Sequence, residues 1–208
     1  HRYSSAASDV YKRQGYGFAR SRNGAVNMHA VTCLPVITGK WANKGGGCLY
    51  GNAGMYPLNW NLVMGLDFRD KSIRELDMCR LGPILLGDEE DLKGGPPVKA
   101  MLIQNTNPAV VCPDQNKVHQ GFRRDDLFLV VHEQFMTETA EFADIVLPAT
   151  MFLEHDDMYT GGGHVYFSVT KPVIKAPGEC RSNHEVMCAL AERLGLDQPG
   201  FKMTACLL

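Results

Sequence analysis

The chain has 208 residues, of which 45% are hydrophobic and 21% are charged, a composition typical of a globular protein that can bury a core. Its net charge of -2 gives no basic excess, so nothing indicates nucleic acid or an acidic membrane surface as a partner, and no apolar run approaches the ~20 residues of a membrane-spanning helix. The seven cysteines show no Cys-x-x-Cys spacing, so we expect reduced thiols and a cytoplasmic location.

The two ends of the chain are expected to lie outside the folded domain. Residues 1–14 (HRYSSAASDVYKRQ) begin without methionine, lack apolar periodicity and look like translated sequencing adapter. A natural disordered terminus is the alternative interpretation. Residues 204–208 form a second uncertain end, so we assign 15–203 to one partial domain.

The first predicted helix begins after Asn23, a residue type that caps helices. Its apolar positions recur every three or four residues, at Val26, Ala30, Cys33 and Ile37. Pro35 is expected to kink or interrupt the last turn, and Gly39 to end the helix. A short helix is expected over 72–80, and the Gly-Gly-Pro-Pro at 94–97 precedes a more regular half of the chain.

That half alternates between strand and helix patterns. The apolar runs at 100–104, 127–131 and 145–147 are typical of parallel strands covered on both faces. Helices are predicted between them at 113–121 and 137–142. This order predicts an α/β fold with a Rossmann-like, doubly wound and mostly parallel sheet.

A last helix is predicted from 182 onward. Ser182 and Glu185 have capping-box spacing, and Gly195 follows as a stop signal. Val186, Leu190 and Leu194 form an apolar stripe that we expect to pack in the core.

Two loops follow the first two predicted strands, namely 105–108 (Asn-Thr-Asn-Pro) and 132–135 (His-Glu-Gln-Phe). In open α/β sheets, ligands bind beyond the carboxyl ends of the strands. A carboxylate such as Glu133 can accept two hydrogen bonds from the Watson–Crick edge of guanine, and Pro108 would rigidify the turn that carries Asn107. The alternative is that these are ordinary turn residues.

Other motifs of known chemistry are absent from the sequence. The triple glycines at 45–47 and 161–163 lack the Lys-Ser/Thr of a phosphate-binding loop. No Cys or His residues have the spacing of a zinc or iron–sulfur site, and no Gly-x-Ser-x-Gly nucleophile motif occurs. From the residues alone, the chain is a domain for a nucleotide-like ligand with an unknown reaction.

Several segments then resemble one known family, in order, over about 15–200. They are the helix entry 17–24 (GFARSRNG), Leu34-Pro35, Thr38-Gly39, the Asn-Pro turn at 105–108, the run 137–148 (TETAEFADIVLP), Glu154, 176–179 (Ala-Pro-Gly-Glu) and Leu194-Gly195. In these segments the chain resembles the dimethyl sulfoxide reductase family of molybdopterin oxidoreductases. The resemblance implies the family's third domain and an oxidoreductase, as an internal fragment that is not active alone.

The resemblance also implies a cofactor, molybdenum bis(molybdopterin guanine dinucleotide), with this domain holding one guanosine end. The implied cofactor-binding residues are Tyr16, Arg20, Asn105, Asn107, His132, Glu133, His155 and Asn183. His132 and Glu133 replace Ser-Asp of many relatives, His155 replaces a lysine, and Asn183 an aspartate. Thr137 and Asp144 are expected to act structurally, as a helix cap and a turn anchor.

The same resemblance places the catalytic residues elsewhere. The family's molybdenum ligand and its iron–sulfur cysteines lie upstream of the matching region, so no catalytic or metal-binding residue is assigned here. The expected partners are the remainder of the same polypeptide and electron-transfer subunits. One alternative is a non-catalytic relative, as in the large subunit of respiratory complex I, and another is a free nucleotide-binding module.

Overall fold

The computed structural model describes residues 11–13, 17, 21–49, 59, 61, 64–160, 166–197 and 199–202. The chain forms two compact units. Unit 1 comprises residues 1–64 and 158–169, and unit 2 comprises 65–157 and 170–208. Within the described residues, no helix is long and apolar enough to cross a membrane.

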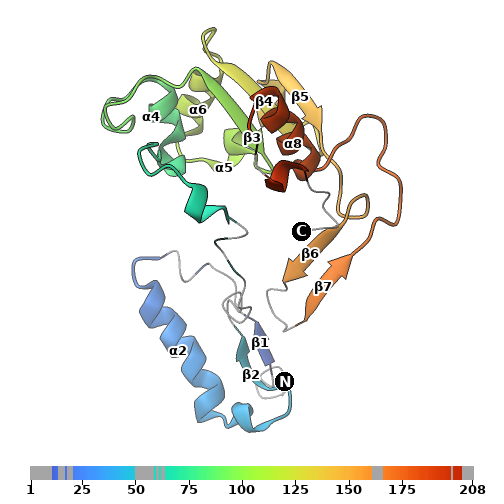
Figure 1. Ribbon diagram of the computed structural model, residues 1–208. Coiled ribbons are helices and arrows are strands. Elements are labelled where there is room, and N and C mark those ends of the chain that lie inside the picture. Colours follow the sequence, from blue (N-terminus) through green and yellow to red (C-terminus); the bar gives the residue numbers. More distant parts are fainter. Residues whose placement is uncertain are drawn as a thin grey trace. The chain divides into compact units, whose positions relative to one another are not determined.

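Unit 1 contains the helix α2 (Gly24–Ile37), the 3-10 helix η1 (Lys40–Ala42) and a small parallel sheet (Figure 1). In that sheet, β1 (Tyr11–Arg13) pairs with β2 (Gly47–Leu49). β1 therefore lies within the stretch 1–14 that we expected to contribute no structure. Two more strands, β6 (Asp157–Thr160) and β7 (Phe167–Thr170), form a separate two-stranded sheet.

The helix predicted after Asn23 is confirmed in α2. It continues through Pro35 to Ile37, and Gly39 follows with a φ of 67°, the left-handed conformation expected after a helix end. Its expected apolar stripe is not buried, since Val26 is 70% and Ile37 77% exposed.

The centre of unit 2 is a parallel sheet in the order β3-β4-β5, which confirms the α/β fold. Its strands are β3 (Ala100–Gln104), β4 (Phe128–Glu133) and β5 (Ile145–Pro148). The register places Gln104 beside His132 and Glu133 beside Pro148, so the three carboxyl ends meet at one edge. Beyond β5, Ala149 forms an isolated parallel bridge with Arg181.

Short helices connect and cover these strands (Figure 1). The α-helices are α4 (Leu81–Leu85), α5 (Pro108–Val111), α6 (Gln115–Phe122), α7 (Glu138–Glu141) and α8 (Asn183–Arg193). The 3-10 helices are η3 (Leu66–Phe68), η4 (Met78–Arg80) and η5 (Pro199–Lys202). The helix predicted at 72–80 is wrong: helical structure begins only at Met78, where the Asp77 side chain accepts a hydrogen bond from the Cys79 N–H.

One face of the sheet packs against α4, α5, α6 and α7. Ile103, Leu129 and Val131 belong to this core, together with Leu85 of α4 and Val118 of α6. Two glycines allow α4 and α6 to approach closely. A Cβ at Gly121 would lie 2.4 Å from Leu85 Cβ, and one at Gly82 would lie 2.7 Å from Lys117 Cβ.

Two polar side chains fix the entry into β5, as their sequence motif predicts. Thr137 caps α7 by accepting a hydrogen bond from the Ala140 N–H. The Asp144 carboxylate accepts the Leu129 N–H at 2.7 Å, while the Asp144 N–H donates to the Leu129 carbonyl. These bonds tie the start of β5 to β4, so that both strands end at the same edge of the sheet.

Candidate functional site at the carboxyl edge of the sheet

The carboxyl edge of the β3-β4-β5 sheet gathers six of the eight residues that the resemblance implies. Asn105 and Asn107 follow β3, and His132 and Glu133 end β4. His155 follows β5, while Asn183 begins α8, just after the bridge at Arg181. Tyr16 and Arg20 lie outside the described residues.

Asn105 is the first residue after β3 and is exposed. Its φ is 54°, a left-handed conformation in which asparagine is enriched among residues with side chains. This backbone turn redirects the chain from β3 toward Asn107 and α5. Because non-glycine residues with positive φ often occur at binding sites, Asn105 is a strong candidate for ligand contact.

Asn107 uses its amide within the protein. Its Oδ1 accepts hydrogen bonds from the Thr139 hydroxyl at 2.7 Å and from the Thr139 N–H at 3.2 Å. Its Nδ2 donates to Glu138 Oε2 at 2.7 Å, and this hydrogen bond is the main cause that lowers the pKa of Glu138. Thr139 Oγ1 in turn accepts the Ala109 N–H. Asn107 therefore joins the Asn-Pro turn to the first turn of α7.

His132 lies inside β4 and is fully buried, so the loop predicted at 132–135 begins later than expected. Its Nδ1 lies 3.0 Å from Gln104 Nε2, and its Nε2 lies 3.1 Å from the Arg181 carbonyl oxygen. The carbonyl can only accept, so Nε2 is the donor of that pair, and Nδ1 accepts from the Gln104 amide. His132 thus links β3, β4 and the segment before α8.

Glu133 is the last residue of β4 and is partly exposed. Its Oε1 accepts the Gln134 N–H at 2.7 Å, which fixes the carboxylate at the end of the strand. No hydrogen bond reaches Oε2 from the part of the chain that the structure describes. One carboxylate oxygen is therefore oriented by the backbone, and the other can accept a hydrogen bond from a ligand.

His155 and Asn183 flank this edge. His155 Nδ1 lies 2.7 Å from the hydroxyl of the buried Thr150, whose carbonyl accepts a hydrogen bond from Gln134 Nε2. Asn183 is the exposed first residue of α8, directly after the capping box of Ser182 and Glu185. The hydrogen bond from the Ser182 N–H is the main cause that lowers the pKa of Glu185.

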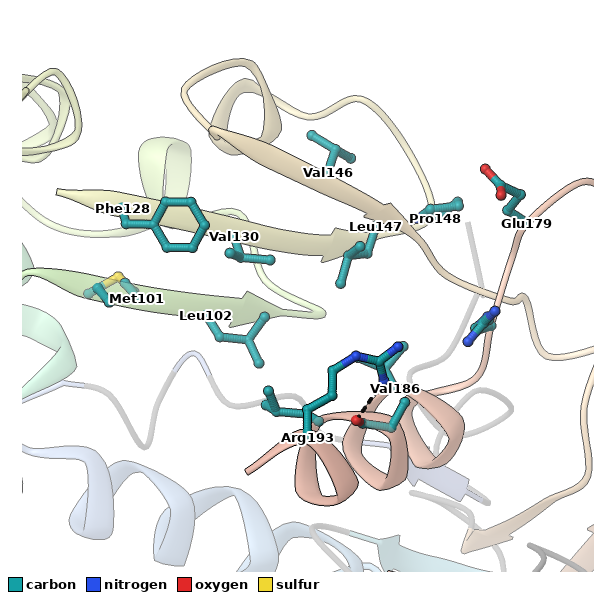
Figure 2. A pocket seen from close by; sticks show the side chains of 14 residues that line it. Met101, Leu102, Phe128, Val130, Val146, Leu147, Pro148, Glu179, Val186 and Arg193 are labelled. Carbon is teal, nitrogen blue, oxygen red and sulfur yellow. Dashed lines mark hydrogen bonds between the residues drawn. The ribbon is translucent and has the colours of Figure 1, made fainter. Parts of the chain in front are cut away.

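A hollow of about 640 Å³ lies between the other face of the sheet and α8 (Figure 2). Leu102, Phe128 and Val130 line it from the sheet, and Val186 lines it from α8. It is mostly apolar, and none of the described residues predicted to bind cofactor lines it. We therefore locate the candidate site at the polar carboxyl edge rather than in this hollow.

Four residues of the edge were missed by sequence reasoning: Gln104, Gln134, Thr139 and Arg181. Thr139 forms a hydrogen bond with Asn107, and Gln134 forms one with the Thr150 carbonyl. The Gln104 amide and the Arg181 carbonyl both form hydrogen bonds with the His132 ring. Thr139 lies inside the familiar run 137–148, so its motif position was an available signal. Gln104 and Arg181 carry no such signal, because their roles depend on strand register.

The sequence of this chain is similar to one protein family and to individual relatives. A family model described as molybdopterin oxidoreductase matches residues 13–193. The probable oxidoreductase YoaE of Bacillus subtilis is 43% identical over 94% of this chain and 28% of its own length. The trimethylamine-N-oxide reductase of Haemophilus influenzae is 26% identical over 88% of this chain and 25% of its length.

Among solved structures, acetylene hydratase from Pelobacter acetylenicus matches 57% of this chain and 16% of its own, with 26% identity and a TM-score of 0.48. The chain spans about a quarter of the length of the curated relatives YoaE and trimethylamine-N-oxide reductase.

Proposed function

We propose, since this chain belongs to the molybdopterin oxidoreductase family, that the carboxyl edge of its parallel sheet binds the guanosine end of a molybdopterin guanine dinucleotide cofactor. The observation that supports this most strongly is the carboxylate of Glu133. Guanine presents two neighbouring donors, its ring N–H and its amino group, and a carboxylate is the acceptor that matches them. Glu133 has one oxygen fixed by the Gln134 N–H and the other available to a ligand.

Asn105 and Glu133 are the proposed direct contacts. Both lie at strand ends of the same sheet, and the side chains of both reach solvent. His155 and Asn183 flank them, and Tyr16 and Arg20 complete the proposed set from the first part of the chain. Asn107 and His132 are proposed as positioning residues, because their polar atoms already bond to Thr139, Glu138, Gln104 and Arg181.

For the complete protein we propose two-electron redox chemistry at a molybdenum bis(molybdopterin guanine dinucleotide) centre, which the bound cofactor would supply. This domain would bind and orient the cofactor. The rest of the polypeptide would provide the molybdenum ligand and an iron–sulfur cluster, and electron-transfer subunits would be its partners. A cytoplasmic location remains part of the proposal. The second candidate, a domain without molybdenum as in complex I, is less favoured because relatives carry oxidoreductase names.

Glu133→Gln in the protein expressed from its complete gene is the decisive test. The substitution replaces the accepting oxygen by an amide that can point a donor at guanine donors. Losing a hydrogen bond to a charged group costs about 1.5–3 kcal/mol, or roughly ten- to hundredfold in affinity. We therefore expect lower molybdenum and guanine nucleotide content per protein. Metal analysis by mass spectrometry and nucleotide analysis after acid release measure both.

Two further variants separate cofactor contact from structural damage. Asn105→Gly removes the amide while keeping a residue that tolerates a φ of 54°, and it should also lower cofactor content. Glu141→Gln neutralises an exposed carboxylate on α7 and should leave the cofactor content unchanged. Full cofactor content in both Glu133→Gln and Asn105→Gly would exclude this edge as the guanosine site. Absence of molybdenum from the unsubstituted complete protein would favour the non-catalytic alternative.

A further inference from the structure

The two faces of the β3-β4-β5 sheet are covered unequally. On β4, Leu129 belongs to the core and is 1% exposed. The side chain of the next residue, Val130, points to the opposite face, where the register puts Leu102, Val130 and Ile145 in one row across the three strands. Leu102 is 38% and Ile145 44% exposed, and Phe128 on the same face is 49% exposed. Within the described residues, this apolar face of the sheet is therefore open.

Helix α8 covers this face only in part. It lies over the strands at a distance that leaves the hollow of about 640 Å³ between them (Figure 2). The apolar stripe of α8 that we expected to pack in the core is itself open, because Leu190 is 41% and Leu194 65% exposed. Parallel strands are normally covered on both faces. The row on the sheet and the stripe on α8 therefore form a surface that fits a further apolar element.

The edge of the sheet at β3 gives an independent observation. Within the described residues, β3 pairs with β4 alone, whereas the far side of β5 carries the bridge from Ala149 to Arg181. Edge strands of native proteins usually contain charged residues or proline, which hinder pairing with another strand. The sequence of β3 is Ala-Met-Leu-Ile-Gln and contains neither. β3 thus has the composition of an inner strand although it lies at an edge.

The connections of the sheet indicate which kind of element fits there. β3, β4 and β5 follow one another in one direction, and the helices between them pack on one face. Crossovers between parallel strands are right-handed, so strands that run from β3 in the other direction bring their helices to the opposite face. A doubly wound sheet consists of two such halves. The described strands form one half, and the open face is where helices of the other half would pack.

We propose that the complete polypeptide places a parallel strand beside β3 and packs a crossover helix on the open row of Leu102, Val130 and Ile145. The occupant is a segment of the same polypeptide, because this chain spans about a quarter of the length of YoaE and trimethylamine-N-oxide reductase. Asn105, just after β3, then lies where the strand order reverses, the position at which open α/β sheets bind ligands. This role of Asn105 rests on the proposed function, whereas the covering of the sheet rests only on a longer polypeptide.

Photo-crosslinking in the protein expressed from its complete gene identifies the occupant of the face. Phe128 is replaced by p-benzoylphenylalanine, which keeps an aromatic side chain at an open position and so preserves the fold. After irradiation and digestion, we expect mass spectrometry to find an adduct with an apolar segment of the same polypeptide outside the 208 residues. Gln120, exposed on α6, carries the same probe as the matched control and should not form this adduct.

The proposal is overturned if the probe at Phe128 attaches only within the 208 residues, to a second copy of the protein, or to nothing. It is also overturned if the probe at Gln120 forms the same adduct in equal yield, because the reaction would then not report on this face.

Amide exchange resolved to single residues tests the added strand in the same complete protein. An edge strand leaves N–H groups on its outer side without a partner, and such groups exchange rapidly. We expect all amides of 100–104 to exchange as slowly as those of β4, which is paired on both sides. Rapid exchange at alternate positions of β3 would show that no strand pairs with it and would reject the proposal.

Neither measurement depends on the cofactor, so the covered face and the guanosine site can fail separately. An adduct at Phe128, together with full cofactor content in Glu133→Gln and Asn105→Gly, would reject the guanosine site alone. Loss of cofactor in those two variants, together with no adduct at Phe128, would reject the covered face alone.

Discussion

At the scale of single residues, the candidate site separates side chains that can face a ligand from side chains that hold the site together. Asn105 and Glu133 have polar atoms available, whereas Asn107 and His132 bond within the protein. The two kinds respond differently to substitution. Loss of an exposed contact affects ligand binding, while loss of a buried partner also affects stability.

Asn107→Ala should lower the free energy of unfolding by about 1–3 kcal/mol, because Thr139, which is fully buried, loses the acceptor of its hydroxyl and N–H. Denaturant unfolding followed by circular dichroism measures the change. Asn105→Gly is the matched control and should change stability by less than about 0.5 kcal/mol, since its side chain is exposed. Equal stability of the two variants would show that the Asn107 network contributes little.

At the scale of elements, α4 and α6 depend on two glycines where they pack together. Gly121→Ala puts a methyl group 2.4 Å from the Cβ of the buried Leu85. Overpacking of this kind costs about 1–3 kcal/mol, against a gain of about 1 kcal/mol in helix propensity. We expect net destabilisation, measured by thermal unfolding. Gln120→Ala, an exposed position of the same helix, should not destabilise.

The start of α8 gives a pH-dependent prediction. The pKa of Glu185 is lowered in the folded protein, chiefly by the Ser182 N–H, so its contribution to stability is present above its unfolded pKa and is lost as pH falls through the folded pKa. Glu185→Gln should therefore be less stable than the parent at neutral pH, with a difference that shrinks in acid. Ser182→Ala should cost about 0.5–2 kcal/mol through loss of the cap. A Glu185→Gln difference that grows as pH falls would contradict this assignment.

At the scale of the whole molecule, we predict that deletion of residues 1–14 affects unit 1 and leaves the sheet of unit 2 unchanged. Deletion of 1–14 removes β1 and its pairing with β2, whereas deletion of 1–10 retains β1. The core of unit 2 contains no residue of this stretch. Amide exchange followed by mass spectrometry should therefore show unchanged protection of β3, β4 and β5 in both deletions.

Leu129→Ala is the positive control for that measurement. It removes a buried side chain from β4 and should lower protection of the same strands, by about 2–5 kcal/mol in opening free energy. Reduced protection of the sheet in either deletion would show that residues 1–14 contribute to the stability of unit 2.

The sequence by itself determined the elements whose signals are local. The strands at 100–104 and 145–147, the capped helix after Ser182, the Thr137 cap and the Asp144 anchor follow from apolar runs and from side chains that bond nearby backbone. The 72–80 helix was wrong and α4 was missed. Gly82 and Pro83 look like helix breakers, yet Pro83 lies in the first turn, where proline is tolerated, and Gly82 permits close packing with α6.

Only the tertiary structure decided which polar residues face outward. His132 and Glu133 are neighbours in sequence, and alternation along a strand sends their side chains to opposite faces. Burial and strand register place the His132 ring against the Gln104 amide and the Arg181 carbonyl, whereas Glu133 lies at the edge of the sheet. These distinctions depend on partners that are 28 to 49 residues apart in the chain, and local pattern does not encode such pairings.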